Sequence, residues 1–204
     1  KRPYIVMEGM SDRFMATYKR PFEAKDIKVV MYAGGLHERY GLKKLTEAFM
    51  MLPQENFRLK LFGSGPFVEK LKTKYTKKDS RIQYMGVAPN AEVVAAELDA
   101  SLLVNPRPTH EEFTKYSFPS KNIEYMASGT PLLTTKLPGM PKEYYPYVFL
   151  IENESVEGYA KALESVLAQS DEELYVFGEK AKDFVLEKKN SFEQAKRVIE
   201  LIKL

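Results

Sequence analysis

Short apolar runs alternate along the chain with segments whose apolar residues recur three or four positions apart. The runs, expected to be strands, lie at 29–33, 57–62, 81–85, 101–104, 131–135 and 147–151. The segments between them have the spacing of amphipathic helices. Alternating strands and helices form βαβ units with a parallel sheet covered on both faces. The pattern therefore predicts an α/β fold, a Rossmann-like doubly wound parallel sheet of about six strands.

Residues with strong local preferences mark the ends of several expected helices. Pro53 ends the first, and Pro66 suits the first turn of the second, because proline lacks the N–H that an interior position needs. Asn90 is expected to cap the third helix. The helix that begins near Pro119 is expected to end at Gly129, in the left-handed conformation that glycine adopts readily.

The C-terminal quarter contains helices with no strand between them. Residues 155–168 are amphipathic, and the patterns Ser170-x-x-Glu173 and Ser191-x-x-Gln194 both fit a capping box. The apolar residues expected to line the last helix are Ala195, Val198, Ile199 and Ile202. The sheet domain is therefore predicted to end in C-terminal helices.

Composition narrows the class of protein. Apolar residues make up 44% and charged residues 29% of 204 positions, as in ordinary soluble globular proteins. The net charge is +3 with basic and acidic residues mixed, so a nucleic acid partner is not expected. With no cysteine, and with His37 and His110 far apart, the sequence predicts neither disulfides nor a zinc site. No segment approaches the ~20 apolar residues of a membrane span, and no signal peptide is recognisable.

A glycine-rich turn follows the first expected strand, at the edge where parallel sheets bind ligands. Gly34 and Gly35 would let backbone N–H groups approach an anion, with Arg39, Lys43 and Lys44 nearby. Tight turns in any doubly wound fold also need glycine, and lysine is common on solvent-facing helices. This turn alone leaves both interpretations open.

The most specific segment runs from Lys115 to Gly129. Free N–H groups at the start of its helix, with the hydroxyls of Ser117 and Ser120, would form a phosphate cradle that has Lys121 at its edge. Glu124, about one turn further on, would accept hydrogen bonds from ribose hydroxyls. The alternative is that serine only caps the helix and that Lys121 and Glu124 form a surface ion pair.

Four segments, taken in order, resemble the donor-binding domain of family 4 glycosyltransferases. These enzymes have the GT-B architecture of two facing Rossmann-like domains. The segments are Tyr32–Leu36, Leu61–Pro66, Arg81–Gly86 and Pro119–Pro131. The resemblance covers residues 29 to about 151 well. It implies that the chain is the C-terminal, nucleotide-sugar-binding half of such an enzyme.

The resemblance also implies a division of the chain. Residues 1–27, in which Tyr4–Met7 is expected to form a short strand, would be the end of a missing N-terminal acceptor domain and the interdomain linker. Residues 28–190 would form the nucleotide-sugar-binding domain. Residues 191–204 would form a helix that crosses back to the acceptor domain.

The resemblance assigns roles at the donor site. The glycine turn would face the diphosphate, the turn at Val87 would border the base, and the helix start would hold phosphate and sugar. Glu124 would bind the ribose hydroxyls. The expected donor-binding residues are Gly34, Gly35, Arg39, Val87, Tyr116, Ser117, Phe118, Pro119, Ser120, Lys121 and Glu124.

The chain departs from the family pattern at three positions. Tyr116 stands where the family has the first of its two glutamates, and Glu111 or Glu112 is the candidate replacement. Gly35 stands where the family has an arginine. The usual lysine falls at Tyr40, and Arg39 beside it is the candidate replacement.

The implied reaction is transfer of a sugar, of hexosyltransferase type, from a nucleoside-diphosphate sugar to an unidentified acceptor. UDP is the default donor nucleotide, and retention of anomeric configuration is expected. The setting would be cell-surface polysaccharide or glycan biosynthesis. No metal or cofactor is expected, because the sequence contains no Asp-x-Asp pair.

The acceptor would bind on the missing domain, so this fragment alone is expected to be inactive. The expected location is the cytoplasm; the inner face of the membrane, with peripheral association of the full-length protein, is the alternative. Two other functions stay open. One is a nucleotide-sugar 2-epimerase of the same architecture, and the other is a non-catalytic, degenerate GT-B domain.

Overall fold

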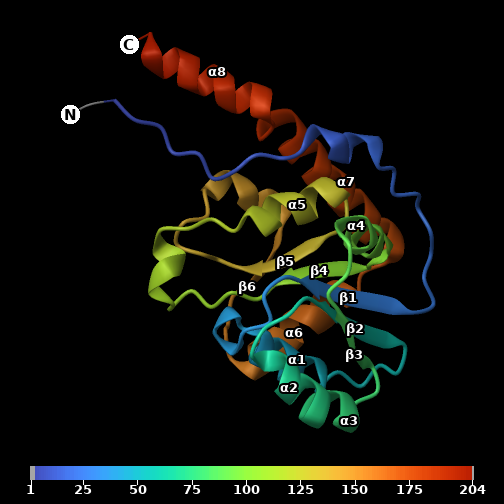
Figure 1. Ribbon diagram of the computed structural model, residues 1–204. Helices are drawn as coiled ribbons and strands as arrows, with labels where there is room; N and C mark the ends of the chain where they lie inside the picture. Colours follow the sequence, from blue (N-terminus) through green and yellow to red (C-terminus); the bar gives the residue numbers. More distant parts are fainter. Residues whose placement is uncertain (1–2, 204) are drawn as a thin grey trace.

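Six parallel strands form the central sheet in the order β3-β2-β1-β4-β5-β6 in the computed structural model, which describes residues 3–203 (Figure 1). The strands are β1 (Lys28–Ala33), β2 (Phe57–Phe62), β3 (Ile82–Gly86), β4 (Leu102–Asn105), β5 (Leu132–Thr135) and β6 (Phe149–Ile151). All neighbouring pairs are parallel. The strand order reverses between β1 and β4. The predicted Rossmann-like sheet is confirmed.

Helices cover both faces of this sheet (Figure 1). One face carries α1 (Leu42–Phe49), α2 (Phe67–Lys70), α3 (Thr76–Lys78) and α6 (Val156–Leu167); the other carries α4 (Asn90–Asp99), α5 (Ser120–Ser128) and most of α7 (Asp171–Lys188). The last helix, α8 (Ser191–Ile202), projects beyond the sheet domain. Among the described residues, no helix is both long and apolar enough to cross a membrane.

The two faces of the sheet have separate apolar cores. In β1, Val30 and Tyr32 pack into the core under α1 and α6, whereas Val29, Met31 and Ala33 pack into the core under α4, α5 and α7. Side chains alternate in this way because successive residues of a strand point to opposite faces. Since both faces are covered, the central strands are apolar at nearly every position.

Several predicted helix ends are confirmed and two are wrong. Gly129 ends α5 with φ of 80°, and Ser170 forms both bonds of its capping box with Glu173. Asn90 makes no cap; it is the first residue of α4, and Pro89 precedes it without a side-chain bond. The last helix is capped one residue earlier than predicted, because the side chain of Asn190 accepts from the Glu193 N–H at 3.0 Å. An Asn in extended conformation is as good a cap as Ser.

The predicted strand at Tyr4–Met7 does not form. Instead the N-terminal segment runs beside α8, where Arg197 donates to the Val6 carbonyl oxygen at 2.9 Å and Gln194 donates to that of Gly9 at 3.4 Å. Side chains of α8 donate the hydrogen bonds that a neighbouring strand would otherwise donate. The segment's carbonyl groups therefore have hydrogen-bond partners although the segment lies outside the sheet. The two chain ends therefore lie on the same side of the domain (Figure 1).

The apolar residues of α8 are not buried by the described part of the chain. Ile199 is 52% and Ile202 77% exposed, and Phe192 is 63% exposed. The prediction that this helix has an apolar face is right, but the rest of the domain does not cover that face. Helices of soluble domains normally bury such a stripe.

Gly41→Ala should destabilise the fold more than Gly86→Ala. Both glycines have left-handed backbone, with φ of 84° and 78°, so alanine costs ~1–2 kcal/mol at either position. At Gly41 the added Cβ would overlap the carbonyl oxygen of Pro106, whereas at Gly86 it would meet nothing within 4 Å. We expect Gly41→Ala to lower the free energy of unfolding by about 1–3 kcal/mol more. Urea unfolding measures the difference, and equal losses would contradict the close contact at Gly41.

Candidate functional site

The reversal of strand order opens a gap at the carboxyl ends of β1 and β4. These strands pair only at Val30↔Leu102 and Met31↔Leu103, and diverge beyond. The Tyr125 hydroxyl of α5 fills the gap: the Ala33 N–H donates to it at 2.8 Å, and it donates to the Ala33 carbonyl at 3.1 Å. Burial raises the pKa of Tyr125 well above its usual value, so the hydroxyl stays neutral. Helix α5 is thereby fixed to the last residue of β1.

The start of α5 lies at this gap. Pro119, buried and extended, precedes the helix, and no side chain caps the first turn. The Asn122 N–H already donates to the Pro119 carbonyl oxygen at 2.9 Å, and the N–H groups of Ser120 and Lys121 are those available to an anion. The hydroxyl of Ser117 donates to the Phe113 carbonyl at 2.9 Å, and the ring of Phe118 packs against Tyr144 at 4.8 Å between centroids. These two contacts hold the loop that leads into the helix.

Three charged side chains from α4 and α5 lie close together. Lys121 Nζ lies 3.1 Å from the Glu124 carboxylate and 3.7 Å from that of Glu97 in α4. Glu97 is fully buried, and its carboxylate oxygens have no hydrogen-bond partner among the described residues. Burial raises the pKa of Glu97 to about 7, although Lys121 opposes this shift. Lys121 thus lies close to two carboxylates, and that of Glu97 titrates near neutral pH.

Glu124 lines a cavity of about 420 Å³ between α4, α5 and the N-terminal segment. Ser120 lies on the same wall, Asn90 and Val94 come from α4, and Phe14 comes from the 3-10 turn Arg13–Thr17. The volume lies within the range of small-molecule sites. Glu124 therefore borders a cavity large enough for a nucleoside.

The glycine turn after β1 lies beside Tyr40, and two arginines lie close to the ring of that tyrosine. The Tyr32 hydroxyl donates to the Gly35 carbonyl at 3.1 Å, which fixes the turn. Arg39 Nη2 donates to the Tyr40 hydroxyl at 3.4 Å, and the guanidinium of Arg107 lies 5.1 Å from the same ring. Arg107 is a site residue that the sequence analysis missed. Its only signal was its place two residues after the end of β4.

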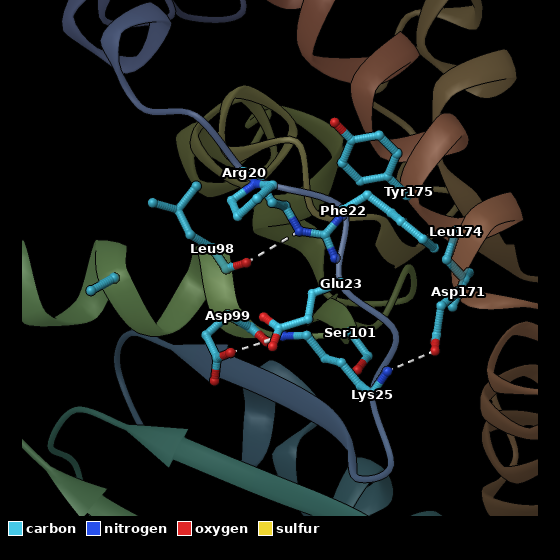
Figure 2. Close-up of a pocket in the computed structure, with 12 residues that line it drawn as sticks. Arg20, Phe22, Glu23, Lys25, Leu98, Asp99, Ser101, Asp171, Leu174 and Tyr175 are labelled. Atoms are coloured by element: carbon cyan, nitrogen blue, oxygen red, sulfur yellow. Dashed lines mark hydrogen bonds and ion pairs between the residues drawn. The ribbon is translucent and has the colours of Figure 1, made fainter.

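A second cavity, of about 210 Å³, lies at the opposite edge of the sheet, beside Ser101, which precedes β4 (Figure 2). Arg20 donates there to the carbonyl oxygens of Leu98 at 3.1 Å and Ala100 at 3.2 Å, at the end of α4. Lys25 pairs with Asp99 at 2.8 Å. These charges fasten the N-terminal segment to the domain and lie away from the gap between β1 and β4.

The fold has counterparts in known proteins. The chain matches the family model of glycosyl transferases group 1 over residues 16–184. This chain belongs to the glycosyl transferase group 1 family. The curated relative WcaL of Escherichia coli (strain K12), assigned as a colanic acid biosynthesis glycosyltransferase, is 27% identical over 147 residues, which are 69% of this chain and 36% of WcaL.

Solved glycosyltransferases share the fold. A glycosyltransferase from Rickettsia africae has a TM-score of 0.76 at 15% identity, covering 98% of this chain and 56% of that protein. Sucrose-phosphate synthase from Thermosynechococcus elongatus has a TM-score of 0.71 at 22% identity over 87% of this chain and 45% of that protein. HepE from Anabaena, solved with UDP and glucose, has a TM-score of 0.68 at 16% identity, covering 87% and 48%. The chain thus spans about half or less of most of these relatives.

In this glycosyl transferase domain the predicted donor-binding residues fall into separate groups. Ser120 and Glu124 line one cavity; Tyr116, Ser117 and Phe118 line another hollow of about 460 Å³, together with 6–8 of the N-terminal segment. Gly34, Gly35 and Arg39 lie at the glycine turn, across the gap. Val87 is 76% exposed in the turn before α4, and Tyr116 is 83% exposed.

The candidates for the missing glutamate lie in the loop after β4. Glu111 precedes the 3-10 turn Glu112–Lys115 and is 4.0 Å from His110. Glu112 is exposed. Lys44, considered for the glycine turn, donates instead to the Glu154 carbonyl oxygen at 2.7 Å. It is therefore engaged at the turn before α6.

Glu97→Gln should change how stability depends on pH. The carboxyl has a pKa of about 7 in the fold, raised from 4.5, so the folded state binds more protons between these values. Wild-type stability therefore falls as pH rises from 4.5 to about 7. Glutamine does not ionise, so the variant should be more stable than wild type at pH 8 by about 1–3 kcal/mol, with little difference at pH 4.5. Urea unfolding at both pH values measures this.

Glu92→Gln is the matched control, since Glu92 is exposed on the first turn of the same helix. This control should keep the wild-type difference in stability between the two pH values. If Glu97→Gln also keeps that difference, the buried carboxyl is not the group that titrates.

Proposed function

We propose that this domain binds a nucleoside-diphosphate sugar, with UDP as the default nucleotide, and forms the donor half of a glycosyltransferase. The observation that carries the proposal is the position of Glu124. Its carboxylate lines a cavity of nucleoside size one turn from the uncapped start of α5. An anion-binding helix start and a carboxylate for ribose hydroxyls are therefore next to each other.

The donor would lie across the gap between β1 and β4. The diphosphate would contact the N–H groups at the start of α5, and the ribose would contact Glu124. The base would extend into the cavity toward Asn90 of α4. HepE, a structural neighbour, holds UDP and glucose, and this supports a nucleotide sugar as the ligand.

The chemical demand on such a site is stabilisation of the departing diphosphate. N–H dipoles fixed at a helix start act on the negative charge as it develops, without reorganising. Tyr125 makes this preorganisation possible, because it fixes α5 to the end of β1. We infer transfer with retention of anomeric configuration, which NMR of the product would test. No metal ion is needed for this scheme.

The acceptor would bind on a domain that precedes this one. We infer that the preceding domain covers the apolar face of α8, because Phe192, Ile199 and Ile202 are exposed there and Tyr4 is exposed on the adjacent segment. This domain alone would bind donor without transferring sugar. A role in cell-surface polysaccharide or glycan synthesis, at the inner face of the membrane, is part of the same proposal.

Glu124→Ala should weaken UDP binding about 10–100-fold, because hydrogen bonds to a charged carboxylate contribute ~1.5–3 kcal/mol. The variant should also bind UDP and 2′-deoxy-UDP with similar affinity, whereas wild type should prefer UDP. Titration calorimetry on this chain and on the full-length protein measures both.

Glu164→Ala is the control, since Glu164 is exposed on α6 at the other face of the sheet. It should bind as wild type does. Absence of binding of UDP, GDP and their sugars by the full-length protein would reject a donor site. Retained preference for UDP in Glu124→Ala would reject only the role of that carboxylate.

A further inference from the structure

A carboxyl group of α4 is buried where that helix approaches α5. Glu97 is 0% exposed, and neither of its carboxylate oxygens has a hydrogen-bond partner among the described residues. The hydroxyl of Thr130 donates to the Glu97 carbonyl oxygen at 2.7 Å, which fixes the backbone there. A buried carboxylate normally receives hydrogen bonds that replace those it made to water. Glu97 therefore needs a donor whenever it carries a charge.

The nearest cation lies between this carboxyl and a second one. Lys121 Nζ is 3.7 Å from Glu97, which is beyond hydrogen-bond distance, and 3.1 Å from Glu124, to which it donates. The Lys121 side chain is 32% exposed, so its position is not locked by packing. A hydrogen bond between an ammonium and a carboxylate is about 2.7–2.9 Å long. A shift of about 1 Å would therefore exchange the partner that Lys121 bonds to.

The other ionisable groups around α4 already have partners. The hydroxyl of Tyr125 bonds to the backbone at the end of β1. In the N-terminal segment, Arg20 donates to two carbonyl oxygens at the end of α4, and Lys25 pairs with Asp99. The side chains of β1 that pack on this face of the sheet are apolar. In the described part of the chain, the lysine of α5 is the cation that Glu97 can draw on.

We propose that Glu97 is a positioning residue of the donor site: when ionised, it draws Lys121 away from Glu124 and so frees that carboxylate to accept the ribose hydroxyls. The inference rests on the proposed function and adds a residue that controls the carboxylate for ribose. Hydrogen bonds to a charged acceptor are stronger than those to a neutral one, so a carboxylate already compensated by an ammonium is a weaker acceptor.

The change of charge on Glu97 falls near neutral pH. Burial raises the pKa of Glu97 to about 7; the charge of Lys121 opposes this shift and that of Glu124 adds to it. Below this pH the carboxyl is neutral and leaves Lys121 to Glu124. Above it the carboxylate attracts Lys121. The contribution of Glu124 to ribose binding should therefore increase as the pH rises.

The experiment measures the affinities for UDP and 2′-deoxy-UDP by titration calorimetry on the full-length protein, at pH 6 and pH 8. Both ligands carry the same diphosphate, so its own titration cancels in the ratio of the two affinities. In wild type the preference for UDP should be about 3–10-fold larger at pH 8. Glu97→Gln cannot ionise, so it should show the lower preference at both pH values. Glu92→Gln, exposed on the first turn of the same helix, is the control and should behave as wild type does.

Lys121→Gln tests the route between the two carboxylates. Without the ammonium, Glu97 has no means of acting on Glu124, so the preference for UDP should not change with pH. This variant also decides the matter if Glu97→Gln does not fold, because Lys121 is partly exposed.

Three results would overturn the positioning role. They are a wild-type preference for UDP that is equal at both pH values, a pH dependence that persists in Glu97→Gln, and one that persists in Lys121→Gln. A purely structural role of Glu97 would lower both affinities alike and leave their ratio unchanged. In each of these cases UDP still binds, so the donor site stands. If wild type binds neither UDP nor GDP at either pH, the proposed function fails and this inference fails with it.

Discussion

The hydroxyl of Tyr125 holds together the two halves of the candidate site. Where the strand order of a parallel sheet reverses, the two central strands diverge toward their carboxyl ends. Backbone N–H and C=O groups at that point have no neighbouring strand to bond to. Here Ala33 donates to and accepts from this one hydroxyl, inside the core. Because Tyr125 belongs to α5, the group that satisfies the end of β1 also sets the distance from the helix start to the glycine turn. A buried unpaired N–H and C=O would be the alternative, at a cost of about 1–3 kcal/mol each.

The site keeps its positive charges in two different environments. Lys121 lies between Glu97 and Glu124, so much of its charge is already compensated. The charges of Arg39 and Arg107 are supported by aromatic rings and stay available to an anion. Compensated and uncompensated positive charge thus come from separate elements of the domain.

The N-terminal segment and α8 belong together physically although they are at opposite ends of the chain. Lys189, buried at the end of α7, pairs with Glu8 at 3.4 Å and with Glu143 at 2.7 Å. Ser11 forms an isolated bridge with Asn190. These contacts fix where the two ends leave the sheet domain, and the apolar residues beyond them are uncovered by the described residues.

Local preference was enough to find the strands, most helices and the start of α5. A strand with an apolar run such as 29–33 buries all of its side chains only in a sheet that is covered on both faces. The start of a helix after Pro119 can be recognised without knowledge of any tertiary contact. The family resemblance added the expectation that Glu124 binds ribose hydroxyls. The sequence pattern failed at Asn90 and at 4–7, because a neighbouring proline and the side chains of α8 decided those positions.

What only the tertiary structure decided is which distant residues meet. Arg107 is 68 residues from Arg39, and no periodicity relates them; both lie close to the ring of Tyr40 because β1 and β4 are neighbours in the sheet. The burial of Glu97 and its approach to Lys121 depend in the same way on the packing of α4 against α5. Sequence spacing fixes the contacts made within one element, whereas the strand order sets the contacts made between elements. In this protein the charges of the candidate site come from several elements, so only the tertiary structure could bring them together.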